Sequence, residues 1–192
     1  MFKRLIVLLA CLFVVFSSQV SAMNLNRFTE DVKIKSALEM LDDIGANEIF
    51  DNLMENSVKI RFYDLGQISY GYKDHFAINT TDTWGNRVIL INTKYQNAPI
   101  EQIACLIAHE SCHKAAVATL AEETTATRKE AQYWTVLKNR NISYADTALT
   151  RRLNNLVNLE STSTVDHDYI QERISNSSFY QNQLAVRERR AF

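Results

Sequence analysis

Residues His109-Glu110-Ser111-Cys112-His113 form an H-E-x-x-H motif, the feature that most constrains how this chain can fold. On a helix, residues four positions apart lie on the same face, one turn above the other. Both imidazoles can therefore reach a single metal ion, and the carboxylate of Glu110 lies beside them. We predict that His109 and His113 are metal ligands, and that Glu110 accepts a proton without being a ligand itself.

The sequence before the motif indicates where its helix begins. Pro99 is the only proline in the chain, and the first turn of a helix is where proline is tolerated. Mostly apolar residues follow as far as Ala108, so we expect a helix over about residues 99 to 114. Two imidazoles in an apolar setting need a partner, because burying polar groups unpaired costs free energy. A metal ion is one such partner.

A third ligand is expected from a second helix after the motif. Thr119 and Glu122 form a capping-box pattern, in which the glutamate reaches back to the start of its own helix. The next residue, Glu123, would then be free to turn towards the histidines. We therefore predict Glu123 as the third ligand and keep Glu122 as the alternative. Glu130 fits better as an acceptor for a histidine N–H than as a ligand.

The first 22 residues have the pattern of a signal peptide. Lys3 and Arg4 precede an apolar run from Leu5 to Phe16, which is too short to cross a bilayer. The run is followed by a small-residue cleavage site that ends at Ala22. A lipoprotein-type site at Cys11 is the alternative, and it fits less well because apolar residues continue after that cysteine. We expect cleavage after Ala22, a secreted or periplasmic location and no stable membrane span in the mature chain.

Composition and cysteine spacing narrow the classes of partner. The chain has 21 basic and 22 acidic residues without a basic run, so nucleic acid is not an expected partner. Cys105 and Cys112 remain after the expected cleavage. On one helix their Cα atoms would be roughly 10 Å apart, which is beyond disulfide reach. We interpret both as small buried thiols and not as metal ligands.

Local patterns predict an α+β domain with a small, antiparallel-rich sheet. Apolar residues at helical spacing between Phe28 and Ile44 predict a helix that ends at Gly45. Apolar and polar residues alternate over residues 58 to 63, as in a half-buried strand, and Arg87 to Asn92 are rich in β-branched residues and predict a second strand. A short strand is possible at residues 77 to 79. Because helices come first, then strands, then helices again, the order is that of an α+β fold.

The chain is expected to divide into three parts. These are a signal peptide over residues 1–22, one domain over 23–160 and a polar C-terminal tail over 161–192. The last helix of the domain is expected to be capped by the pattern Ser143-x-x-Asp146 and to run to about Glu160.

The chain resembles the zincin metallopeptidases, and within them the gluzincin type, in which a glutamate ligand follows H-E-x-x-H on the next helix. It is also similar to small exported bacterial proteins with this arrangement. The resemblance covers about residues 58 to 140. It rests on the strand Arg87 to Asn92, the motif at 109–113, and Glu122-Glu123-x-x-Ala126 leading to Trp134. The metzincin variant does not fit, because Ala116 and Thr119 stand where its glycine and third histidine would be.

The resemblance implies a catalytic zinc ion, Zn²⁺, held by three protein ligands with water in the fourth position. It implies hydrolysis of a peptide or protein substrate with Glu110 as general base. It also implies that the strand before the motif helix pairs with an extended peptide. For a residue that stabilises the oxyanion, His167, Tyr169 and Tyr180 are candidates by residue type only. The alternative function is a non-catalytic exported domain that binds a metal or a partner.

Overall fold

The computed structural model describes residues 23–114, 118–140 and 143–177, and it has the predicted α+β class. The expected signal peptide, Cys11, Ala116 and Tyr180 lie outside these residues. Its α-helices are α1 (Val32–Asp43), α2 (Asn47–Glu55), α3 (Ile100–Ser111), α4 (Leu120–Leu137), α5 (Ala148–Thr162) and α6 (Tyr169–Asn176). Its strands are β1 (Lys59–Tyr63), β2 (Ala77–Thr81) and β3 (Arg87–Asn92).

The three strands form one mixed sheet in the order β1-β3-β2. Strands β2 and β3 are an antiparallel hairpin, but β1 runs parallel to β3. The prediction of an antiparallel-rich sheet is therefore wrong for one of its two pairings. Parallel strands cannot be joined by a tight turn and need a longer connection. Here the chain leaves β1, forms β2 on the far side of β3, and only then turns back through the hairpin into β3.

The central strand β3 is buried on both faces, which explains its nearly continuous apolar sequence. Ile89 and Ile91 belong to the main core beneath the helices. Val88 and Leu90 point to the opposite face and pack in a small cluster with Leu65. Side chains alternate along a strand, so Arg87 shares the helix-facing side with Ile89. Asn79 of β2 lies directly opposite Ile89 in the register and therefore also faces the helices.

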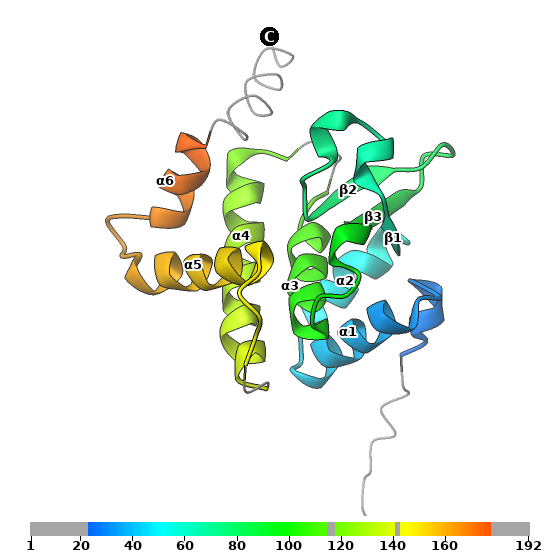
Figure 1. Ribbon diagram of the computed structural model, residues 1–192, viewed down its shortest axis with the longest axis horizontal. Helices are drawn as coiled ribbons and strands as arrows, with labels where there is room; N and C mark the ends of the chain where they lie inside the picture. The colour runs from blue at the N-terminus through cyan, green and yellow to red at the C-terminus, as the bar shows by residue number, and fades with distance from the viewer. Residues whose placement is uncertain (1–22, 115–117, 141–142, 178–192) are drawn as a thin grey trace, which may run out of the picture.

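Helix α3 occupies the centre of the fold. Figure 1 shows it between α4 on one side and the sheet with α1 and α2 on the other, and it contacts all of these elements. Every residue from Glu101 to Ser111 is buried, as is usual for a helix covered on all sides. The histidine motif at its C-terminal end is thus placed inside the protein, against both the sheet and α4.

The motif helix is shorter than predicted. We expected it to reach residue 114, but α3 ends at Ser111 and Cys112 is its C-cap, so His113 follows the helix. His113 stays close to the helical path, because its N–H donates to the carbonyl of Glu110 at 3.3 Å. Side chains from the sheet, those of Asn79 and Arg87, bind carbonyls at this end of the segment.

The C-terminal helices cover α4. Helix α5 is capped by Thr147, whose hydroxyl accepts from the N–H of Thr150 at 3.1 Å, so the predicted cap at Ser143-x-x-Asp146 is wrong. Within the expected polar tail, α6 packs on α4 and α5 and buries Ile170 and Ile174. Among the described residues, none of the helices is both long and apolar enough to span a bilayer.

Candidate metal centre

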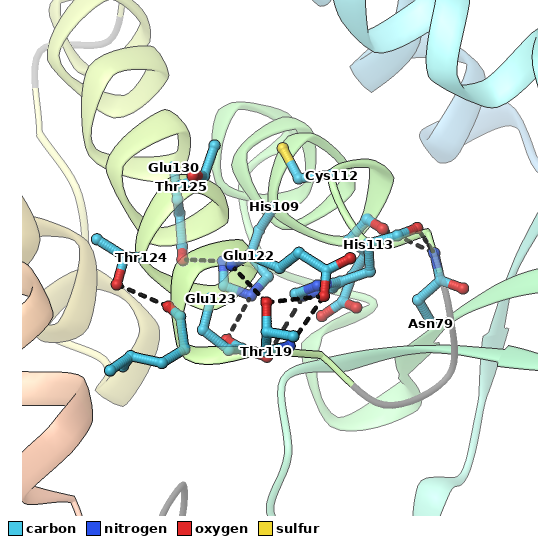
Figure 2. A network of polar contacts seen from close by, with 12 residues as sticks. Asn79, His109, Cys112, His113, Thr119, Glu122, Glu123, Thr124, Thr125 and Glu130 are labelled. Atoms are coloured by element: carbon cyan, nitrogen blue, oxygen red, sulfur yellow. Dashed lines mark hydrogen bonds and ion pairs between the residues drawn. The ribbon is translucent and has the colours of Figure 1, made fainter. Parts of the chain in front are cut away.

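The structure brings the three predicted ligands together between α3 and α4 (Figure 2). The Nε2 atoms of His109 and His113 lie 3.7 Å and 3.6 Å from the two carboxylate oxygens of Glu123. One donor atom from each residue lies within 4.8 Å of the other two, and all three side chains are buried. The two imidazole rings are tilted by 70° to each other. Two nitrogens and one carboxylate therefore converge on one point.

The spacing of these three groups suits coordination of a shared metal ion better than direct hydrogen bonds between them. Their separations exceed the length of an ordinary hydrogen bond. Ligand atoms about 2.0–2.1 Å from a tetrahedral zinc ion are separated from each other by roughly 3.3 Å. The two histidine–carboxylate distances, 3.7 Å from His109 and 3.6 Å from His113, are close to that value and involve different oxygens of Glu123. The nitrogen and oxygen donor set is also one that zinc prefers, so the residues present fit this metal.

The capping box decides which of two neighbouring glutamates faces the histidines. Thr119 is the N-cap of α4, and its hydroxyl accepts from the N–H of Glu122 at 3.1 Å. The Glu122 carboxylate accepts in return from the N–H of Thr119 at 2.8 Å. Glu122 is thus directed to the helix start, while Glu123 points to His109 and His113 (Figure 2). The capping-box prediction is confirmed, and the geometry favours Glu123 over Glu122 as the ligand.

Glu130 lies against the other nitrogen of His109. Its Oε2 is 3.0 Å from His109 Nδ1, and the carboxylate is completely buried. A carboxylate in this place fixes the ring orientation and keeps the proton on Nδ1, which leaves Nε2 free to act as a ligand. The 3.0 Å separation agrees with the expected role of Glu130 as an acceptor for a histidine, while the direction of the Nδ1–H bond departs from that of a regular hydrogen bond.

Burial and neighbouring charges adjust the pKa values of both histidines. Burial, reinforced by the charge of nearby His109, lowers the pKa of His113 to about 3. Burial also acts to lower the pKa of His109, but the contact with Glu130 outweighs it and the pKa is raised. A metal ligand must be a neutral imidazole. His113 meets this requirement throughout the neutral range.

Glu110 is buried beside the histidines but is not part of the converging group. Burial raises the pKa of its carboxyl to about 7, against a smaller lowering effect of His109. A carboxylate in a water-poor site with a pKa near neutrality is suited to accept and return a proton at neutral pH. This is the role predicted for Glu110 from its place in the motif.

Two side chains from the sheet hold the end of the motif segment. Asn79 of β2 donates to the carbonyl of Glu110 at 2.7 Å and to that of His113 at 3.4 Å. Arg87 of β3 also donates to the carbonyl of His113. Sequence reasoning missed both residues. The signal that could have found them is their polarity at helix-facing positions of buried strands, where a polar side chain needs a partner.

Several other sequence expectations are corrected or remain without support. Strand β3 is hydrogen-bonded on both sides, so it cannot pair with a peptide, and β2 is the edge strand beside the site. His167 is half-exposed and pairs with Glu172 at 2.8 Å, so it is engaged away from the converging ligands. Cys105 and Cys112 are free thiols; Cys105 is buried as expected, whereas Cys112 is only partly buried, and neither belongs to the group of described residues that could hold a metal.

Comparison of the chain with models of protein families, with curated proteins and with solved structures finds no match. The chemistry of the site therefore rests on the residues themselves.

Proposed function

We propose that this protein is a zinc-dependent metallopeptidase of the zincin type, exported through its N-terminal signal sequence. The observation that carries the proposal is the convergence of His109, His113 and Glu123 on one point beside a buried carboxylate, Glu110. Three protein donors leave the fourth position of a tetrahedral zinc ion open, which is the arrangement of catalytic sites, whereas structural zinc sites close all four positions.

Each residue has a distinct part in the proposed reaction. His109, His113 and Glu123 would hold the ion, and a bound zinc ion supplies Lewis acidity towards the scissile carbonyl and the attacking water. Glu110 takes the proton of that water and delivers it to the leaving amine. Its raised pKa suits both steps, because the same carboxyl must be ionised first and protonated later. Glu130 keeps the ring of His109 oriented.

The substrate we propose is an extended peptide or protein segment. Strand β2 is at the edge of the sheet and carries Asn79, which contacts the motif directly. An edge strand presents unpaired backbone groups, and an extended peptide can bind to these as an additional strand. The substrate would then lie beside Glu110 and the open ligand position.

Hydrolysis of a broad peptide library by the mature chain tests this proposal. We expect cleavage by the wild type, inhibition by a zinc chelator, and a loss of about 10²- to 10⁴-fold in rate for Glu110→Gln, since an amide cannot accept the proton. The zinc content of that variant should remain that of the wild type. A wild type that holds zinc but cleaves no peptide would instead favour a non-catalytic exported metal-binding domain.

A further inference from the structure

His109 is contacted at both of its ring nitrogens. Nε2 lies 3.7 Å from Glu123, and Nδ1 lies 3.0 Å from Glu130. A neutral imidazole carries a single N–H, on one nitrogen or the other. If Nε2 is to bind a metal, the hydrogen must be on Nδ1, where a correctly oriented carboxylate oxygen has to accept it. The orientation of Glu130 therefore bears directly on His109.

Arg152 of α5 forms a bidentate contact with the Glu130 carboxylate, one hydrogen bond to each oxygen. Arg152 Nε donates to Oε1 at 3.1 Å, and its Nη2 donates to Oε2 at 2.5 Å. A two-point contact of this kind fixes the plane of a carboxylate, because both oxygens are held by one rigid guanidinium. Without it, the carboxylate could rotate about its last bond and turn Oε2 away from His109.

Arg152 is itself held in place by the protein interior. Its side chain is 23% exposed. Its guanidinium carbon lies 5.4 Å from the centre of the Phe76 ring, within the range of an attractive cation–π contact. Helix α5 also buries Leu149 and Leu153 in the same core as α3. The position of Arg152 is therefore set by the packing of α5 and not by solvent.

We propose that Arg152 is a positioning residue of the metal site: through Glu130, it holds the His109 ring with Nε2 directed at the ion. This inference rests on the metal site of the proposed function. It makes α5 part of that site, although all three proposed ligands come from α3, the residues just after it, and α4. The neighbouring Arg151 has no such role, because it is exposed and pairs with Asp146 on the surface.

Zinc affinity measured by competition with a chromogenic chelator tests the proposal on the full mature chain. Arg152→Met should weaken zinc binding by about 10- to 100-fold, as expected when the group that orients a ligand is lost. Arg152→Lys should also weaken zinc binding, because an ammonium keeps the charge but cannot form the bidentate contact with both oxygens. The matched control Arg151→Met removes only an exposed ion pair, so its affinity should stay within about twofold of wild type.

A double-variant cycle separates positioning from a general structural effect. If Arg152 acts through Glu130, then Arg152→Met should cause no further loss of zinc affinity in a Glu130→Gln background. The double variant removes a buried charge together with its partner, so it avoids the penalty of an uncompensated buried carboxylate and keeps the test usable if Arg152→Met alone fails to fold. Equal affinities for Arg152→Met and Arg151→Met, or fully additive losses in the cycle, would overturn the proposal.

The outcomes also distinguish this inference from the proposed function. Zinc binding by the wild type together with weak binding by Arg152→Met supports the positioning role, even if no peptide is cleaved. An active, zinc-binding wild type with unchanged affinity in Arg152→Met overturns the positioning role alone. A wild type that binds no zinc overturns both.

Discussion

Glu122 and Glu123 are neighbours in the sequence, yet their carboxylates point to different parts of the protein. Glu122 accepts from the N–H of Thr119 at 2.8 Å and closes the start of α4. Glu123 lies 3.6 Å from His113, which follows α3. Successive residues of a helix are rotated by about 100°, so fixing the first glutamate at the cap directs the second towards α3. The capping box thus sets the rotation of α4 that the site requires.

Glutamine substitutions at these two positions should have different effects. Glu123→Gln removes an anionic donor, so zinc affinity should fall, and thermal stability in the presence of zinc should fall with it. Glu122→Gln should leave zinc affinity near that of the wild type and cost at most about 1 kcal/mol of unfolding free energy, which is typical for a weakened cap. Chelator competition and urea unfolding measure the two quantities. Loss of zinc in Glu122→Gln but not in Glu123→Gln would contradict the assignment.

The raised pKa of Glu110 predicts a stability effect in the metal-free protein. Its folded pKa of about 7 exceeds the ordinary value of 4.5, so between these pH values the folded state binds more protons than the unfolded state. The stabilising contribution of Glu110 is thus complete below pH 4.5 and is lost as the pH rises through 7. Glu110→Gln, which stays neutral, should therefore gain stability relative to wild type as the pH rises through this range, reaching roughly 3 kcal/mol above pH 7.

Urea unfolding of both proteins at pH 5 and pH 8, with a chelator present, measures this difference. Comparing the variant with the wild type at each pH removes the contributions of other titrating groups, such as His113. An advantage for Glu110→Gln that is the same at both pH values would show that the carboxyl does not titrate in this window.

Asn79 should stabilise the end of the motif segment. Asn79→Ala leaves the buried carbonyl of Glu110 without its 2.7 Å donor. The expected loss is about 0.5–1.5 kcal/mol of unfolding free energy, the net contribution of one hydrogen bond, because the N–H of His113 still donates to that carbonyl. Zinc affinity should also fall, because His113 follows the helix and depends on this contact for its place. Asn86→Ala is the control: it removes an exposed hydrogen bond to Asp82 in the β2–β3 turn, so it should cost less stability than Asn79→Ala and leave zinc affinity unchanged.

Removal of zinc should lower the unfolding temperature of the wild type. A ligand that binds only the folded state adds about 4 kcal/mol of stability at a thousandfold excess over its Kd. Calorimetry with and without a chelator should therefore separate the two forms clearly. In a His109→Ala/His113→Ala variant the chelator should have no effect. A shift of equal size in both proteins would place the metal elsewhere.

Much of the site could be predicted from the sequence because its parts are local. The H-E-x-x-H spacing places two imidazoles on one side, and the capping box orients Glu123, so each prediction depended on residues within a few positions of one another. Strand β3 was also predicted with its observed bounds, because its run of β-branched apolar residues predicts a strand without information from the rest of the chain.

The features that sequence reasoning missed depend on distant contacts. Asn79 lies 31 residues before Glu110, and Arg152 lies 22 residues after Glu130 on a helix outside the resemblance. Single-sequence patterns carry no information on such pairing. The parallel pairing of β1 with β3 was missed for the same reason, because both strands look alike whichever way they pair. The contacts of Asn79 and Arg87 with the end of the motif segment were missed for the same reason, because both residues come from the distant sheet.

Elemental analysis of the untagged mature protein tests the central claim most directly. We expect close to one zinc ion per chain in the wild type, and none above background in the His109→Ala/His113→Ala variant, because two of the three converging donors are then missing. Both proteins should be purified in the same buffers, with folding verified by circular dichroism. Equal zinc content in the wild type and the folded double variant would show that His109 and His113 do not hold the metal.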